Sequence, residues 1–408
     1  MVTSDKRIPN DLLEHAKALH KIAPLIDGHN DLPWKIRKKV GSALSKIDIS
    51  KNQVEFHTDI PRLKEGCVGG LFWSVFVSPD LKEQNFVHAT LDQIDLVYNM
   101  IKRYPETFQL TLTADEVEQA FQSGKIASLI GLEGGHSIGN SLDALRMFFY
   151  LGARYMTLTH NKDVSWAASA TDGGDEKGFT KFGEEVINEM NRLGMIVDLS
   201  HVSLKTMKDV LGVANAPVIF SHSASRELID TPRNVPDDVL KQLLGNGGII
   251  MTTFVPGFIS KKGNKYYKKL NKEYKRLKSL PDSTEESMEE KIKKWIKENP
   301  APRVNLADVA DHIDHIRSII GIDHIGIGSD FDGTFSVPEG LEDVSKFPNL
   351  TVELLQRGYS DDDILKILGK NILRVMREVE EVAKRMQKER GPSEATIEEL
   401  DGLREQSA

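Results

Sequence analysis

His29 and Asp31 lie two residues apart where an apolar run ends, in the stretch LIDGHNDLPW at residues 25–34. Side chains alternate along a β-strand, so residues at positions i and i+2 leave the strand on the same face. The imidazole and the carboxylate would therefore converge on one point beyond the end of the strand. Histidine nitrogens and carboxylate oxygens are common ligands of zinc, and we expect a metal ion at this point.

Other apolar runs of the chain also end in a residue with a metal-binding or acid–base side chain. These residues are Glu133, His160, His201, His222 and Asp330. Scattered structural residues would have no reason to prefer one end of every run. Four such donors could hold one metal ion, whereas five or more with a carboxylate among them suit two, and we expect two. The ligand types favour Zn²⁺, although Mn, Fe and Co accept the same set.

Eight short apolar runs would position these residues. They span residues 25–29, 69–77, 126–134, 154–160, 195–201, 217–222, 248–254 and 324–330. Their nearly continuous apolar character is typical of parallel strands buried on both faces, and the segments between them are long enough for crossover helices. Ser141 and Ser203 precede two helical patterns as capping residues. The pattern predicts an α/β fold, a (β/α)8 TIM barrel, whose active site lies at the carboxyl ends of its strands.

An open, doubly wound sheet would also alternate strands and helices. Its ligands would gather at one switch point of the sheet, whereas here the polar residues follow nearly every strand and so form a ring. We therefore favour the barrel.

The chain of 408 residues is long enough for one large barrel with insertions. We expect a single metallopeptidase domain over residues 1–380, followed by a polar C-terminal helix or tail over residues 381–408. Residues 261–300 carry 13 lysines and arginines against seven acidic residues, and we interpret them as a helical insertion after strand seven. Such an insertion could form a lid over the metals or an arm that packs on a neighbouring subunit.

The overall composition excludes several classes of protein. A net charge of −8 argues against general nucleic-acid binding. No stretch approaches the roughly 18 apolar residues of a membrane span, and neither end resembles a secretory or lipid-anchor signal. The single Cys67 excludes an intramolecular disulfide and a thiolate cluster. We expect a soluble, cytoplasmic protein that binds neither membranes nor nucleic acids.

The chain resembles the membrane (renal) dipeptidase family of binuclear zinc peptidases, peptidase family M19. The motifs that carry the resemblance are GHNDLPW, LEGGHSIGNSLDALR, YMTLTHN, DLSHVS, FSHSASRELIDTPRNVPDD, GIGSDFDG and VPEGLEDVSKFPNL. They lie in the family's order and cover residues 25 to about 377. The resemblance implies a barrel of the metal-dependent hydrolase type with two zinc ions. Its metal ligands would be His29 and Asp31 on one ion, His201 and His222 on the other, and Glu133 as the bridge between them.

The resemblance also implies roles in catalysis and substrate binding. A hydroxide shared by the two zinc ions would be the nucleophile. Asp330 matches the carboxylate that carries the proton, with Asp332 as the alternative. His160 matches the residue that contacts the substrate carbonyl and stabilises the tetrahedral intermediate. Arg233 matches the residue that grips the C-terminal carboxylate of the substrate, which would make the enzyme a dipeptidase.

The chain departs from the secreted animal members in residues 261–300, in the sequence between His222 and Arg233, and in its lack of disulfide cysteines and an anchor signal. It looks more like the intracellular relatives of bacteria and fungi, some of which trim cysteinyl-glycine units from glutathione conjugates. We expect small dipeptide substrates and a homodimer, as is usual in the family. Two alternatives remain at this point: a catalytically silent barrel that binds a small peptide or conjugate, and a mononuclear amidohydrolase or deaminase.

Three residues beside the expected ligands have structural interpretations. Asp27 and Asp198 are expected to order the ends of their strands by hydrogen bonds. His136 could orient Glu133 from behind or could serve packing alone.

Overall fold

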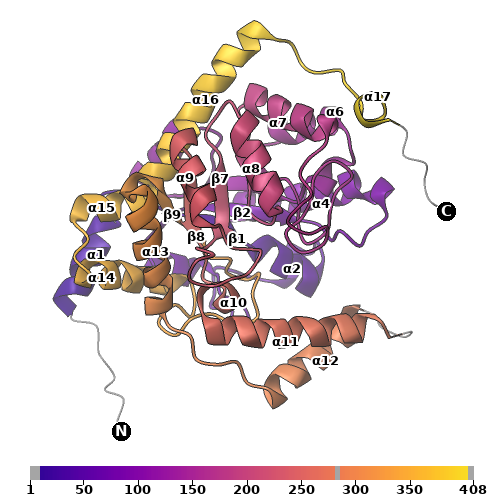
Figure 1. Cartoon of the computed structure of the whole chain (residues 1–408). Helices are drawn as coiled ribbons and strands as arrows, with labels where there is room; N and C mark the ends of the chain where they lie inside the picture. Colours follow the sequence, from indigo (N-terminus) through magenta and orange to yellow (C-terminus); the bar gives the residue numbers. More distant parts are fainter. Residues whose placement is uncertain (1–9, 281–284, 403–408) are drawn as a thin grey trace.

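The computed structural model of the chain describes residues 10–280 and 285–402, in which a ring of parallel strands is surrounded by helices (Figure 1). Within these residues eight strands pair in the order β2-β1-β9-β8-β7-β6-β5-β4, and β2 pairs with β4 to close the barrel. Their bounds are β1 Leu25–Asn30, β2 Val68–Phe76, β4 Ile126–Glu133, β5 Ala153–Thr157, β6 Ile196–Asp198, β7 Ile219–Ser223, β8 Ile249–Thr252 and β9 Ile325–Ile327. The predicted (β/α)8 barrel is confirmed, and each expected strand lies within or overlaps one of these.

A ninth strand, β3 (Phe108–Leu110), was not expected from the sequence. It pairs with the first residues of β4, Ile126 to Ser128, whereas β5 pairs with β4 from Ile130 onward. The amino-terminal half of β4 is therefore covered by β3 outside the ring. A run of three residues is too short to show a periodic pattern in the sequence.

Helices alternate with the strands and cover the outside of the barrel. Their bounds are α1 Asn10–Leu19, α2 Leu32–Val40, α3 Ile60–Glu65, α4 Phe86–Arg103, α5 Ala114–Gln122, α6 Leu142–Tyr150, α7 Lys181–Leu193, α8 Leu204–Val213, α9 Asp237–Asn246, α10 Pro256–Ile259, α11 Lys261–Lys278, α12 Glu285–Glu298, α13 Leu306–Ile320, α14 Phe347–Gln356, α15 Asp361–Leu365, α16 Asn371–Glu389 and α17 Ile397–Asp401. The Ser141 and Ser203 side chains cap α6 and α8 by accepting backbone N–H bonds, as predicted.

The barrel interior is a packed core. Ile26, Phe72, Leu129, Tyr155 and Met251 belong to one buried cluster that also includes residues of α16. Glycines admit the larger side chains, because a Cβ on Gly131 would lie 2.1 Å from the Tyr155 ring and one on Gly28 would lie 2.4 Å from the Met251 sulfur. The Tyr155 phenol thereby reaches the end of the interior that is nearest the carboxyl ends of the strands, where the site described next lies.

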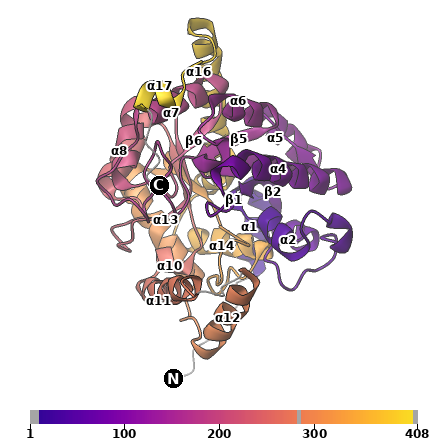
Figure 2. The same ribbon diagram turned by 90° about the vertical axis from the view of Figure 1, so that its right-hand side faces the viewer.

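The segment after β8, the seventh strand of the barrel, forms the helices α10, α11 and α12, as expected of a helical insertion. α11 and α12 lie side by side at the lower edge of the molecule (Figure 1 and, turned by 90°, Figure 2). They share a small apolar cluster of their own, made by Leu270, Leu277, Met288 and Ile292. Residues 281–284, which are part of the predicted insertion, lie outside the described residues.

α16 runs from Asn371 to Glu389 and contributes to the core along part of its length. The division predicted between residues 380 and 381 falls inside this helix, and it stays a prediction. Residues 403–408 of the predicted tail lie outside the described part. Among the described helices, none is both long and apolar enough to cross a membrane.

Candidate metal centre

Four imidazoles surround one carboxylate oxygen at the carboxyl ends of the strands. The Oε1 atom of Glu133 lies 3.6 Å from Nε2 of His29 and 3.2 Å from Nε2 of His201. It lies 3.7 Å from Nε2 of both His160 and His222. Burial would raise the pKa of Glu133, but the surrounding imidazoles hold it well below its usual range. The carboxylate is therefore ionised at the centre of the cluster.

β1 and the start of α2 supply the pair that the sequence indicated. The His29 Nε2 and Asp31 Oδ2 atoms are 3.3 Å apart. Asp31 occupies the N-cap position of α2 without making a capping bond, so its carboxylate is free to face the cluster. Asp31 N donates to the carbonyl of Phe331 at 2.8 Å, which ties this turn to the loop after β9.

The other nitrogen of His29 determines where its proton lies. Nδ1 is 2.8 Å from the Tyr155 hydroxyl, and that hydroxyl donates to the Gly28 carbonyl at 3.2 Å. When the phenol donates to Gly28, Nδ1 donates to the phenol, and Nε2 is the nitrogen that faces Asp31 and Glu133. Burial would lower the pKa of His29, but the charges of Tyr155, Glu133 and Asp31 raise it well above its usual range. This buried Nε2 has no hydrogen-bond partner among the described residues. A nitrogen that faces two carboxylates lies where a proton or a metal cation offsets their charge.

His201 and His222, from the ends of β6 and β7, form the second part of the cluster. Their Nε2 atoms are 2.9 Å apart. Burial lowers the pKa of both imidazoles well below their usual range, so both are neutral, the form that binds metals. The Ser221 hydroxyl donates to Asp198 at 2.6 Å, so His222 Nδ1 donates to Ser221 at 2.8 Å and its Nε2 is bare. These two Nε2 atoms and the Oε1 atom of Glu133 lie close enough together to bind one metal ion.

The loop after β9 presents Asp330 to the cluster and turns Asp332 away. Asp330 offers an oxygen that lies within 4.8 Å of ligand atoms of His29 and Asp31. Burial, and then the charge of Asp31, raise the pKa of Asp330 well above its usual range, so this carboxyl can carry a proton. The Asp332 carboxylate instead accepts from the His57 backbone N–H at 2.8 Å. Of the two carboxylates, Asp330 is therefore the one that lies with the expected metal ligands.

His160 and Arg233 complete the group of predicted site residues. The His160 ring lies 4.5 Å from that of His201, and burial lowers its pKa. Arg233 is only 4 % exposed, and its Nη2 donates to the His222 carbonyl at 3.4 Å. Its Nη1 has no hydrogen-bond partner in the described part of the chain. A buried guanidinium with a free N–H beside the cluster is suited to binding a carboxylate.

Buried aspartates order the strand ends, as expected. Asp27 accepts from the backbone N–H and the hydroxyl of Ser329 at 2.7 and 2.6 Å. Asp198 accepts from the hydroxyls of Thr157 and Ser221, both at 2.6 Å. These bonds join β1 to the loop after β9, and β6 to its neighbours on either side.

His136 makes its hydrogen bond with the backbone. Its Nε2 lies 2.9 Å from the Val77 carbonyl, and its ring packs on Phe86 at 5.0 Å. No bond from His136 to Glu133 is found within residues 10–280 and 285–402. The packing interpretation of His136 therefore fits the structure better than a role in orienting Glu133.

The sequence did not indicate the residues that form hydrogen bonds with the expected metal ligands. Tyr155 lies in an expected strand but is 126 residues from His29, and nothing in the local pattern links the two. Ser221 adjoins His222 and could have been suspected on that ground alone. Ser74 of the neighbouring strand β2 donates to the Oε2 atom of Glu133 at 3.2 Å.

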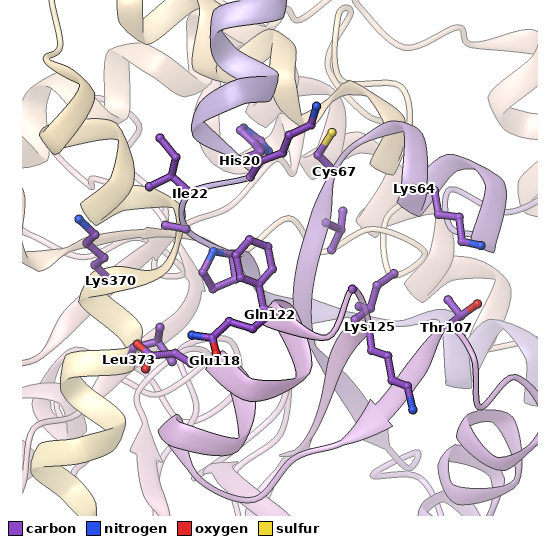
Figure 3. Close-up of a pocket in the computed structure, with 17 residues that line it drawn as sticks. His20, Ile22, Lys64, Cys67, Thr107, Glu118, Gln122, Lys125, Lys370 and Leu373 are labelled. Atoms are coloured by element: carbon purple, nitrogen blue, oxygen red, sulfur yellow. The ribbon is translucent and has the colours of Figure 1, made fainter.

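A separate cavity of about 660 Å³ lies at the opposite end of the barrel, against the residues where β1, β2 and β4 begin. Three of its four lysines, Lys64, Lys125 and Lys370, point in different directions in Figure 3, so these three do not converge on one ligand. None of the metal-centre residues lines this cavity.

Comparison with known proteins identifies the family that this chain matches and solved structures with the same fold. The family described as "Membrane dipeptidase (Peptidase family M19)" matches residues 13–390. A crystal structure of the probable dipeptidase PvdM from Pseudomonas aeruginosa is similar, with 24% identity, 92% of this chain and 100% of that chain covered, and a TM-score of 0.79. A metallo peptidase from Rhodobacter sphaeroides, liganded with a phosphinate mimic of the dipeptide L-Ala-D-Ala, has 23% identity, covers 88% and 99%, and has a TM-score of 0.73.

Proposed function

This chain belongs to the membrane dipeptidase family, peptidase family M19, and from that premise we propose that it is a dipeptidase that uses two zinc ions. Its substrates are dipeptides with a free C-terminal carboxylate. The observation that carries the proposal is the position of Glu133 Oε1, within 3.7 Å of four imidazole Nε2 atoms. A bridging carboxylate is what a binuclear site needs and a mononuclear one does not.

The donor set divides into two groups that share Glu133. His29 and Asp31 would hold one ion, and His201 and His222 would hold the other. Two ions bound there would lower the pKa of a water molecule toward about 7 and polarise the scissile carbonyl. The imidazole and carboxylate ligands favour zinc, although Mn, Fe and Co accept the same set.

The remaining residues bind the substrate and move its protons. Arg233, with its free Nη1, takes the C-terminal carboxylate in a charge-assisted hydrogen bond. His160 donates to the substrate carbonyl oxygen as negative charge develops on it. Asp330, whose pKa is raised, accepts a proton from the attacking water and delivers it to the leaving amine.

The finer parts of the proposal concern the biological setting. Cysteinyl-glycine and its conjugates are included among the substrates to be tested. A cytoplasmic location suits a chain with a single cysteine, because disulfides are rare in that compartment. A homodimer is proposed from the family resemblance.

The experiment combines metal analysis with a dipeptide panel. Purified protein should contain two zinc ions per chain and should hydrolyse Ala-Ala, Ala-D-Ala and Cys-Gly but not their C-amidated forms. Glu133→Gln should lower the content toward one ion per chain, and Asp332→Asn serves as a control with an unchanged content. Two tightly bound ions in the Glu133 variant would remove the bridge, and equal turnover of amidated substrates would remove Arg233 from its role.

A further inference from the structure

Tyr267 lies on α11, the first long helix of the insertion, and comes close to the substrate-binding end of the metal centre. Its ring packs edge-on against Phe258 of α10 with the ring centroids 5.5 Å apart. The guanidinium of Arg233 lies over the same Phe258 ring, 5.1 Å from its centroid. Phe258 therefore has a tyrosine and the carboxylate-binding arginine as neighbours.

Close packing between α10 and α11 fixes the position of Tyr267. A Cβ on Gly257 would lie 2.7 Å from the Tyr267 ring, and one on Gly263 would lie 2.0 Å from the Pro256 carbonyl oxygen. The Asn264 side chain donates to the Gly257 carbonyl at 2.8 Å. The two glycines allow α10 and α11 to approach each other. The hydrogen bond from the Asn264 side chain then fixes their relative position.

The far end of α11 is attached to the other side of the barrel mouth. Lys278, in its last turn, pairs with Asp80 in the loop after β2, and Asp80 also pairs with Lys162 after β5. α10 follows β8, and β9 and β1 stand between β8 and β2 in the ring. α11 thus connects two separate positions on the rim of the mouth.

The hydroxyl of Tyr267 can donate one hydrogen bond to a ligand. A hydrogen bond with the Asn271 side chain lowers the pKa of the phenol. Burial, which has the larger effect, raises the pKa of Tyr267, and the charges of Arg233 and Asp330 also act on it. The phenol packs against the same Phe258 ring as the guanidinium of Arg233, whose Nη1 is unpaired among the described residues.

We propose that Tyr267 is a specificity-determining residue, which donates a hydrogen bond to the C-terminal carboxylate held by Arg233 and, with Phe258, bounds the space for the C-terminal side chain. The inference rests on the proposed function and adds a residue from the insertion to it. In this role α11 is a fixed wall of the substrate site.

The test compares Tyr267→Phe with Tyr274→Phe in the metal-loaded protein. Tyr274 lies on the same helix and is 41% exposed, so it is a matched control. Loss of one hydrogen bond to a charged group should raise KM for Ala-Ala about tenfold, with kcat within about twofold. A phosphinate analogue of Ala-Ala should bind the Tyr267 variant about tenfold more weakly in calorimetry, and the control should match the wild type in both measurements.

A second variant tests the wall. Tyr267→Ala should increase kcat/KM for Ala-Phe relative to Ala-Gly at least about threefold, because it enlarges the space for the C-terminal side chain. If this variant does not fold, the Phe variant decides the question.

The outcomes separate this inference from the proposed function. An active wild type with wild-type KM and phosphinate affinity in Tyr267→Phe would overturn the inference alone, as would a loss confined to kcat. A wild type that neither hydrolyses dipeptides nor binds the phosphinate would overturn the proposed function and this inference with it.

Discussion

His29 and His222 of the metal centre each have a hydroxyl group beside Nδ1, the nitrogen that faces away from Glu133. The Tyr155 hydroxyl lies 2.8 Å from Nδ1 of His29, and the Ser221 hydroxyl lies 2.8 Å from Nδ1 of His222. Both arrangements place Nε2 toward Glu133, where it could bind a cation. Partners of this kind typically change metal affinity about 10- to 100-fold when they are removed.

A substitution at Asp330 can distinguish an effect on proton transfer from an effect on metal binding. Asp330→Asn should retain both metal ions but lower kcat about 10²-fold or more, because the amide cannot accept the proton of the attacking water. Elemental analysis and steady-state kinetics with Ala-Ala measure both effects.

Asp332→Asn is the matched control for Asp330, since the Asp332 carboxylate bonds to the His57 backbone instead of facing the metal centre. Its kcat should stay within a few fold of the wild type. If metal is lost in the Asp330 variant, Asp330 is a ligand and not only the proton carrier.

At the scale of elements, the strand ends and the turns that follow them direct the site residues. His201 and Asp330 both have left-handed backbone conformations, with φ of 70° and 63°. Non-glycine residues adopt this region at a cost of about 1–2 kcal/mol, which the surrounding hydrogen bonds must offset. These turns direct the imidazole of His201 and the carboxylate of Asp330 into the mouth of the barrel, just beyond the ends of β6 and β9.

The contact between α10 and α11 is sensitive to the addition of a single methyl group. In Gly263→Ala the new Cβ would meet the Pro256 carbonyl, a backbone atom that cannot move aside alone, so α11 must shift. We expect a loss of about 1–3 kcal/mol in the free energy of unfolding and a raised KM for dipeptides. Urea denaturation and kinetics measure the two effects.

Gly245→Ala in α9 is the control for that substitution, because no atom lies within 4 Å of the added Cβ. It should raise stability by up to about 1 kcal/mol and leave KM unchanged, as Ala favours helix over Gly. Equal behaviour of the two variants would show that α11 is not packed against α10 as described.

At the scale of the whole molecule, buried histidines make the fold sensitive to acid. Burial lowers the pKa of His20, His57 and His312 to about 4, from an ordinary value of 6.5. Between these two pH values the unfolded chain binds protons that the folded protein does not, so stability falls as pH falls from about 6.5 to 4. Asp27 and Asp332, whose pKa burial raises to about 6, act in the opposite direction and offset part of the loss.

His20 tests this pH dependence away from the metal centre. It is 1% exposed and joins α1 to α14 through a 2.8 Å bond with Thr351. In metal-free protein, the stability advantage of the wild type over His20→Gln should shrink by at most about 3 kcal/mol from pH 7 to pH 4. Urea denaturation at several pH values measures it, and a constant difference between the two proteins would contradict the assignment.

Local patterns in the sequence were sufficient for the barrel and for the residues that meet at its mouth. The eight apolar runs recur with polar ends, and Ser141 and Ser203 cap their helices through bonds to residues three positions ahead. Such features depend on alternation and on short-range hydrogen bonds, so they are legible in a single chain. The motifs of the dipeptidase family added roles that spacing alone did not assign.

Contacts between distant segments were decided only by the tertiary structure. The Asp332 carboxylate is held by the backbone of His57, and the ring of His29 is held by Tyr155, 126 residues away. Tyr267 reaches Phe258 because two glycines allow the helices to approach. Closure of the barrel brings these side chains together, and a one-dimensional pattern does not specify which loops meet once the ring has closed.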